Sequence, residues 1–212
     1  GGALFVPPHQ RHIVGLMADL ESFIARHDLP VLAQAAIAHA QFETIHPFAD
    51  GNGRTGRALV HAILRARGVT SSVALPISAG LLARVDDYFA ALDAYRAGDV
   101  ELIVELTALA ALEAVERGSW LAAELLEIRA EWNGILTARK DALAWQVLDL
   151  LIRRPVLTTA AVAEEFAVSA ETARNALDRL EADGIAVSAQ VDKRQRAWRS
   201  PDVLLLLDDF AA

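Results

Sequence analysis

The sequence has no cysteine among its 212 residues. This absence excludes disulfides, cysteine-ligated zinc and thiol catalysis, and it fits a reducing cytoplasm. The chain has no apolar run near the roughly 18–20 residues that span a bilayer, since its longest purely aliphatic stretch is 203–207. Its first residues lack an initiator methionine and the basic region and apolar core of a signal peptide. We therefore expect a cytoplasmic protein without a membrane segment, and a chain that begins inside a longer protein.

Net positive charge is lacking as well. The formal net charge is −8 at pH 7, which excludes a general nucleic-acid binder. Hydrophobic residues make up 54% of the chain, above the usual range of about 45–50%. Much of the excess is alanine and leucine, which favour helices. A mainly α protein is therefore predicted, long enough for one medium domain and one small one.

The first 140 residues are predicted to form a helical bundle. Apolar residues recur at helical spacing over 13–24 and again over 31–45. Pro47 and Gly51 interrupt this pattern with a loop. A third helix is predicted from about residue 53 to residue 67, and the glycine that follows is its stop.

Glycines divide the remainder of the predicted bundle. After an apolar connector at 73–77, the pattern predicts helices over 80–97, 99–117 and 119–140. Gly98 and Gly118 are the predicted stops of the first two, because glycine readily adopts the backbone conformation that ends a helix. Asp99 is the predicted N-cap of the second.

Residues 141–212 have a different character and are predicted to form a separate domain. A proline at position 155 ends the first helix of this region. Thr158 or Thr159 and Ser169 are predicted N-caps of two further helices. The predicted order is a helix over 141–152, a strand over 156–158, helices to 166 and over 169–182, and a hairpin of 185–189 with 196–199 around 192–194. This is the order of a winged helix.

The segment from His46 to Arg57, HPFADGNGRTGR, combines residue types that suit a polyphosphate. Two glycines flank an asparagine directly before a helix. There the backbone N–H groups can curl around an anion, and the helix start adds unpaired N–H groups. Arg54 and Arg57 are three residues apart, so they share one helical face and offer forked guanidinium groups to phosphate oxygens.

Two more residues of this segment suggest chemistry. Asp50 is an acid in a cationic place, which a Mg²⁺ ion bridging phosphates would explain, because this ion prefers carboxylate and phosphate oxygens. His46 lies at the other lip of the loop, where it could take a proton from an attacking hydroxyl. Taken singly, Gly-Asn-Gly is a common turn, Asp50 a common cap and Arg54 a common surface residue. The prediction depends on their occurring in order within twelve residues. Phe48 is predicted to be a core anchor for the loop.

The same segment resembles the signature of Fic-domain proteins, His-x-Phe-x-Asp/Glu-Gly-Asn-Gly-Arg-x-x-Arg, and agrees with it at every fixed position. Residues 5–8 resemble the segment that follows the family's target-docking flap. Residues 41–46 resemble the helix that delivers the histidine, and residues 87–92 resemble a later helix. The resemblance implies a Fic-type helical bundle at 1–140, followed by a small winged helix-turn-helix domain at 141–212, which accompanies many bacterial Fic proteins.

The resemblance also implies an activity, the transfer of AMP from ATP to a tyrosine, threonine or serine hydroxyl of a target protein or of the chain itself. His46 would be the catalytic base, and Asp50 would bind Mg²⁺. Tyr88 would approach the adenine, although packing explains it equally well. The phosphate contacts would come from the backbone around Gly51 and Gly53, from Asn52 at the α-phosphate, and from Arg54 and Arg57 at the β- and γ-phosphates.

Functions besides AMP transfer stay open. In the phosphate-transferring Doc branch of this family, lysine typically stands where this chain has Gly53, and it reverses the orientation of the nucleotide. Gly53 therefore favours AMP transfer over phosphate transfer. Two further functions fit the sequence, namely a DNA-binding regulator whose Fic fold senses nucleotide, and a toxin-like module that a partner holds inactive.

A restraining segment is missing from the sequence. Fic enzymes are often restrained by a helix with the pattern Ser/Thr-x-x-x-Glu-Gly/Asn, whose glutamate pairs with the second arginine of the signature, here Arg57. This pattern does not occur in the chain. We expect the restraint to lie on a preceding part of a longer chain or on a partner, and this chain to be more active than the complete protein.

The predicted winged helix has a mixed charge. From Lys140 onward the chain has nine Lys/Arg and twelve Asp/Glu, whereas DNA binders usually present a basic face. Because the predicted wing alone is basic, with Lys193 and Arg194, a protein contact or a homodimer is favoured over DNA. Trp145 and Trp198 are predicted core residues rather than base-stacking platforms. The remaining histidines lack the paired spacing of a zinc site.

Overall fold

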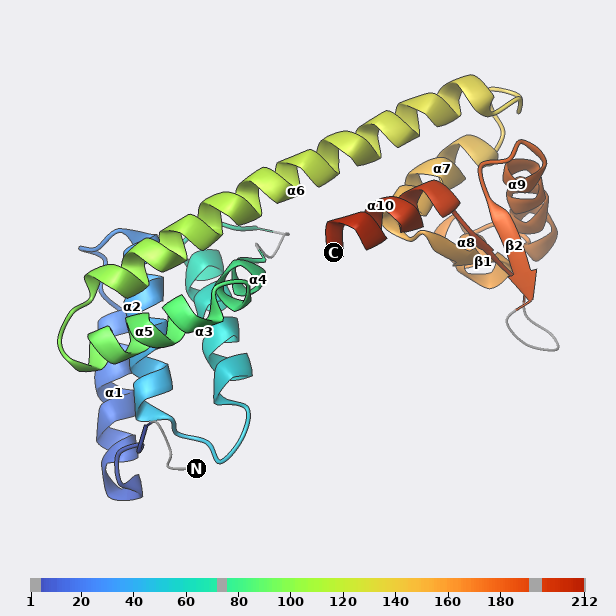
Figure 1. Ribbon diagram of the computed structural model, residues 1–212. Helices are drawn as coiled ribbons and strands as arrows, with labels where there is room; N and C mark the ends of the chain where they lie inside the picture. Colours follow the sequence, from blue (N-terminus) through green and yellow to red (C-terminus); the bar gives the residue numbers. More distant parts are fainter. Residues whose placement is uncertain (1–4, 72–75, 191–195, 212) are drawn as a thin grey trace. The chain divides into compact units, whose positions relative to one another are not determined.

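The computed structural model describes residues 5–71, 76–190 and 196–211 (Figure 1). The chain divides into two compact units, residues 1–118 and 119–212. Helices dominate each unit, and the single sheet found among the described residues has three strands. The predicted mainly α fold is confirmed.

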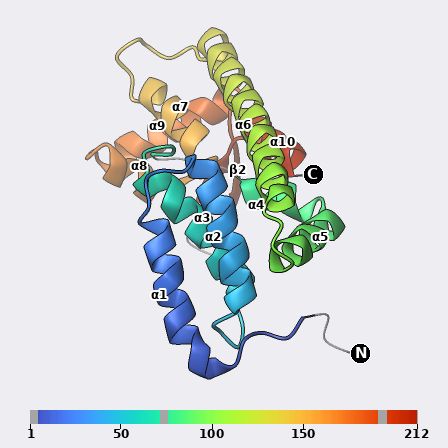
Figure 2. The same cartoon turned by 90° about the vertical axis from the view of Figure 1, so that its left-hand side faces the viewer.

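The first unit is a bundle in which α2 is central. Its helices, after a 3₁₀ turn at Gln10–His12, are α1 (Ile13–Ile24), α2 (Val31–Ile45), α3 (Asn52–Ala66), α4 (Ile77–Leu82), α5 (Val85–Arg96) and the first part of α6 (Glu101–Ile135). Helix α2 packs against α1, α3 and α5, and the neighbouring α1 and α3 can be followed in Figure 2. Its alanines at 35, 36, 38 and 40 are fully buried. These small side chains let the neighbouring helices approach closely.

The prediction of one helix over 80–97 is wrong. Helix α4 ends at Leu82 and α5 begins at Val85, because Arg84 has a non-helical backbone (φ −125°, ψ 51°). The guanidinium of Arg84 pairs with the carboxylate of Glu113 on α6, with Nη1 2.8 Å from Oε2. This tertiary ion pair favours a turn of the chain where the local pattern would continue a helix. Of the predicted connector, residues 73–75 lie outside the described part of the chain, and Ile77 begins α4.

The predicted stop at Gly118 is also wrong, because α6 continues through it to Ile135. A glycine in a helix interior costs about 1 kcal/mol relative to alanine, which a helix of 35 residues can tolerate. Gly98 has a φ of 99° and does follow the end of α5, as predicted. Asp99 caps the start of α6, since its Oδ1 accepts a hydrogen bond from the backbone N–H of Glu101 at 2.9 Å.

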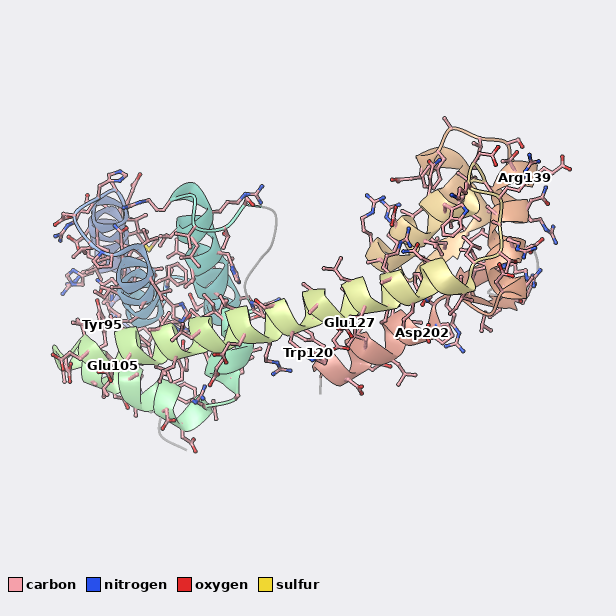
Figure 3. The ribbon with its side chains drawn as sticks, turned by 90° about the horizontal axis from the view of Figure 1, so that it is seen from above. Tyr95, Glu105, Trp120, Glu127, Arg139 and Asp202 are labelled. Carbon is pink, nitrogen blue, oxygen red and sulfur yellow. The ribbon has the colours of Figure 1, made fainter. Side chains whose placement is uncertain are left out.

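The second unit begins earlier than the predicted boundary at 140/141. Its core includes Trp132 of α6 together with Leu136, so the second part of α6 packs with this unit. The indole Nε1 of Trp132 donates a hydrogen bond to Asp202 at 3.2 Å, and Figure 3 labels Asp202 on α10 (Pro201–Ala211). The assignment of the two units as Fic catalytic domain and winged-helix domain stays a prediction.

The elements of the second unit follow the predicted order. They are α7 (Ala144–Arg153), β1 (Val156–Thr158), α8 (Thr159–Glu165), α9 (Ala170–Ala182), β2 (Val187–Gln190), β3 (Arg196–Arg199) and α10. The antiparallel sheet has the order β1-β3-β2, with Leu157 and Ser188 opposite Trp198. The predicted caps are confirmed, because Thr158 and Ser169 accept hydrogen bonds from the first turns of α8 and α9. The predicted hairpin turn at 192–194 lies outside the described residues.

Helix α10 is absent from the sequence-based assignment. Its start has recognisable signals, because Pro201 occupies the first helical position and Ser200 Oγ accepts a hydrogen bond from the Val203 N–H at 3.3 Å. Trp198 is 1% exposed, which confirms its predicted core position, while Trp145 is half-buried and packs against the same core. Within the described part of the chain, no helix has both the length and the apolar composition needed to cross a membrane.

Candidate active site

His46 is placed by the way α2 ends. Its backbone is left-handed (φ 50°, ψ 58°), and its N–H donates to the Phe42 carbonyl at 2.9 Å. A right-handed helical residue is disfavoured directly before a proline, so Pro47 favours this exit from the helix. A left-handed non-glycine residue costs on the order of 1–2 kcal/mol. The packing of α2 therefore offsets this cost, and the half-buried imidazole of His46 is kept where the loop begins.

Asn52 closes the loop that follows. It is 2% exposed. Its Oδ1 accepts a hydrogen bond from the Phe48 N–H at 3.0 Å, and its Nδ2 donates to the Phe48 carbonyl at 2.7 Å. The predicted core anchor is therefore wrong, because the Phe48 side chain is 50% exposed and the buried amide of Asn52 holds the loop instead. The Phe48 ring lines an apolar groove beside α1 and α3.

The two glycines leave room for the two guanidinium groups. Gly51 has a φ of 85°, and a Cβ on it would lie 3.4 Å from Nη2 of Arg54. A Cβ on Gly53 would lie 3.2 Å from Nη1 of Arg57. Both arginines therefore lean back toward the start of α3, as helical side chains do. No side chain caps this helix start, so cationic groups and free backbone N–H groups converge there.

Asp50 stands at the outer edge of this cluster. Its carboxylate is largely exposed and lies 3.3 Å from Nη2 of Arg54, whose side chain is also exposed. Among the described residues, no group of three or more histidine, aspartate or glutamate side chains could hold a metal ion. A lone, accessible carboxylate nevertheless fits Mg²⁺, which usually takes only one or two protein carboxylates and fills its remaining positions with phosphate and water.

A buried polar layer lies below the loop. His39 is 2% exposed, and its Nε2 is 2.9 Å from the Tyr88 hydroxyl. Burial lowers the pKa of His39 and raises the pKa of Tyr88. Glu43 is 9% exposed and lies between His39 and His46 in the sequence. The Tyr88 hydroxyl is thus engaged by His39, and its predicted contact with adenine stays a prediction.

The structure brings most of the predicted site residues together, because the loop and the first turns of α3 carry all of them except Tyr88, which comes from α5. Glu43 is not among the site residues predicted from the sequence. A signal was present, because His39, Glu43 and His46 are spaced four and three residues apart in an alanine-rich helix. This spacing puts His39 and Glu43 on one face of α2, whereas His46 follows the end of the helix with a left-handed backbone.

Comparison with known proteins identifies this region. Residues 1–64 match the model of the Fic/DOC family. A protein of Aquifex aeolicus (strain VF5), named probable protein adenylyltransferase, is 39% identical over 69 residues, which are 32% of this chain and 22% of that protein. The protein adenylyltransferase fic-1 of Caenorhabditis briggsae is 28% identical over 116 residues, 53% of this chain and 22% of that protein. The chain thus spans about a fifth of the length of these curated relatives.

A solved structure extends the likeness in fold. A Fic family protein from Desulfovibrio desulfuricans G20 superposes with a TM-score of 0.51 at 27% identity, over 94% of this chain and 58% of that one. Together, the family match, the relatives and the solved structure show that residues 1–64 of this chain are similar to the Fic/DOC family and that the chain is similar in fold to a Fic family protein.

Proposed function

We propose that this protein transfers AMP from ATP to a hydroxyl group of a target protein. The observation that carries the proposal is the convergence of the Arg54 and Arg57 guanidinium groups over two glycines at the uncapped start of α3. His46 stands at the other end of the same loop. The names of the curated relatives, protein adenylyltransferases, agree with this proposal.

The triphosphate binds at the start of α3. Arg54 and Arg57 take the β- and γ-phosphates, since guanidinium forks match phosphate oxygens. The backbone of Gly51 and Gly53 lies against the phosphates without side-chain obstruction. Asn52 was predicted to contact the α-phosphate, but in this conformation its amide bonds Phe48. We therefore assign it the further role of keeping the loop in its phosphate-binding shape.

In the transfer step, the imidazole of His46 accepts the proton of the target's tyrosine, threonine or serine hydroxyl. The hydroxyl oxygen forms a bond to the α-phosphorus, and the bond from that phosphorus to the bridging oxygen breaks. Pyrophosphate leaves, and its charge is stabilised by Arg54 and Arg57. Positioning and charge stabilisation supply most of the acceleration, and a general base contributes typically 10²–10⁴-fold. Asp50 would hold Mg²⁺, which when bound supplies positive charge to the phosphates.

The second unit is proposed to be a winged helix that contacts protein, including a second copy of this chain, rather than DNA. Its described arginines are mostly paired within the unit, including Arg174 with Asp178 and Arg179 with Asp183. Paired cations have less to gain from DNA phosphates. Lys193 and Arg194 of the predicted wing lie outside the described residues. A cytoplasmic location, where ATP and Mg²⁺ are abundant, belongs to the same proposal.

Labelled ATP tests the reaction. The purified chain is incubated with Mg²⁺, lysate protein and ATP labelled at either the α- or the γ-phosphate. AMP transfer predicts label on protein from the α-phosphate only, whereas label from the γ-phosphate would establish phosphate transfer instead. The variant His46→Ala should lose roughly 10²–10⁴-fold in transfer rate and retain ATP binding. The matched variant His27→Ala, at an exposed histidine, should transfer normally. Equal loss of binding and transfer in His46→Ala would contradict the base role.

A further inference from the structure

Helix α6 has apolar side chains on two faces within the first unit. One face packs into the core, where Ile103, Leu106 and Ala110 are buried. The apolar residues of the other face are 45–63% exposed and are Leu102, Leu109, Leu112 and Val115. A helix that covers a core on one side normally presents polar residues on the other. Exposed apolar residues that gather on one surface often mark a contact with another molecule.

The exposed leucines form a row along α6. Leu102, Leu109 and Leu112 are seven and three residues apart, a spacing that keeps them on one side of a helix. Val115 extends the row by three residues. At a rise of about 1.5 Å per residue, the row from Leu102 to Val115 is about 20 Å long, which matches about four turns of a second helix. Figure 3 labels Glu105, which lies within this stretch of α6.

The charged residues beside this row are all acidic. Residues 101–116 contain four glutamates and no lysine or arginine. Glu113 accepts a hydrogen bond from Arg84 at 2.8 Å. The other three are exposed, form no salt bridge within the described part of the chain, and are Glu101, Glu105 and Glu116. A partner that covers the leucines therefore meets carboxylates that are available to its cations.

The same charges disfavour a second copy of this chain on this face. In an antiparallel pairing that sets Leu109 of one copy against Leu112 of the other, Glu105 meets Glu116. In a parallel pairing, each glutamate meets its own counterpart. Like charges placed opposite each other suppress such a pairing. A nucleic acid is disfavoured for the same reason, because its phosphates are negative.

We propose that the outward face of α6 over residues 101–116 docks a basic amphipathic helix of a partner protein. Apolar side chains of that helix, three or four residues apart, pack along the leucine row. Its lysines or arginines pair with the three exposed glutamates, and their aliphatic stems cover the margins of the row. The proposal does not depend on AMP transfer, because α6 lies outside the segment from His46 to Arg57.

A synthetic helical peptide, with leucine along one face and lysine beside it, is the probe for this surface. It is titrated into the full chain and followed by calorimetry and by ¹⁵N NMR. We expect saturable binding, with shift changes centred on residues 101–116 and an affinity that falls as salt is added. A control peptide with the same residues in scrambled order has the same charge and no apolar face. It should bind about tenfold more weakly or less.

Two pairs of matched variants locate the binding on α6. Leu112→Ser should weaken peptide binding about tenfold, whereas Leu126→Ser, at a leucine that is 71% exposed on the same helix, should not change it. Glu105→Lys should weaken binding about three- to tenfold, because it reverses an attraction. Glu127→Lys makes the same change at another exposed glutamate of α6, also labelled in Figure 3, and should leave the affinity unchanged. All four positions are exposed, so the fold of each variant should be retained.

Three results would overturn the proposal. The first is no saturable binding of the lysine peptide, and the second is equal loss in Leu112→Ser and Leu126→Ser. The third comes from analytical ultracentrifugation of the chain alone. A dimer that Leu112→Ser dissociates would show that a second copy, rather than a basic helix, covers this face of α6.

Discussion

Arg54 and Arg57 of α3 occupy an electrostatic setting opposite to that of Arg179 and Arg196 in the second unit. On α3, Arg57 makes no salt bridge among the described residues, and Arg54 meets only the exposed Asp50 at 3.3 Å. In the second unit, Arg179 binds both carboxylate oxygens of Asp183 at 2.9 and 3.0 Å, and Arg196 lies 2.9 Å from Glu181. Exposed ion pairs contribute little, so the first pair of arginines is available to an incoming anion.

The difference teaches how to tell a binding arginine from a structural one. Both units place arginine on a helix, and the sequence around each contains acids at helical spacing. In the first unit, glycines free the space in front of the guanidinium groups. In the second, Asp183 also accepts hydrogen bonds from Thr137, so its carboxylate is part of the fold. The predicted site is therefore distinguished by guanidinium groups that no buried carboxylate engages, rather than by arginine as such.

The largest expected difference between the two units follows from replacing an arginine of each with alanine. We expect Arg57→Ala to weaken binding of a non-hydrolysable ATP analogue with Mg²⁺ by about 10- to 100-fold, because charged hydrogen bonds contribute about 1.5–3 kcal/mol each. Arg196→Ala should leave this affinity unchanged and lower the stability of the second unit. Isothermal titration calorimetry measures the affinity of both variants. If the two variants bound the ATP analogue equally well, the proposed difference between Arg57 and Arg196 would be wrong.

Glycine replacement tests whether close packing is special to the site. At Gly56 a Cβ would lie 2.6 Å from Glu43 Oε1 and 2.9 Å from His39 Nδ1, whereas Gly118 in α6 has open space. We expect Gly56→Ala to destabilise the first unit by about 1–3 kcal/mol and Gly118→Ala to stabilise α6 by about 0.5–1 kcal/mol. Urea unfolding followed by methyl NMR signals of Ile45 and Ile63 measures the first unit. If Gly56→Ala left the stability of the first unit unchanged, the side chains of His39 and Glu43 would have to move aside for the added methyl group.

Acid should affect the units over different pH windows. Burial lowers the pKa of His39 below 6.5, so the unfolded chain takes up a proton first, and stability is lost as pH falls through 6.5. The raised pKa of Glu43 acts in the opposite sense, since that contribution is complete below 4.5 and is lost as pH rises. The net loss in the first unit should stay under about 1.4 kcal/mol per pH unit.

The second unit should respond only at lower pH. Burial would raise the pKa of Asp183, but hydrogen bonds from Thr137 and Arg179 outweigh it and leave the pKa below 3.8. Its contribution is therefore present above about pH 4 and is lost as pH falls further. All four tryptophans lie in 119–212, so their fluorescence reports this unit, while the methyl signals above report the first. If the tryptophan fluorescence and the methyl signals were lost at the same pH, the two units would not respond over separate pH ranges. The variant His39→Asn should remove the loss of stability of the first unit near pH 6.5.

Much of the fold could be predicted from the sequence because the relevant signals are local. The apolar spacing in α1 and α2, the stops at Gly68 and Gly98, and the caps at Thr158 and Ser169 act within a few residues. The break between α4 and α5 could not be predicted, because it involves a tertiary ion pair between Arg84 and α6. The position of Phe48 was predicted wrongly for a related reason, since a buried amide four residues later holds the loop.

By itself, the sequence determined the predicted phosphate-binding segment, because His46 to Arg57 are contiguous and their order fixes which groups meet at the start of α3. Only the tertiary structure decided which charges are free. Packing of α2 against α3 buries Glu43 beside Gly56, and the sheet and α9 pair the arginines of the second unit. The reason is that the sequence sets which ionisable side chains are present, whereas their burial and ion pairing depend on which surfaces the folded chain brings together.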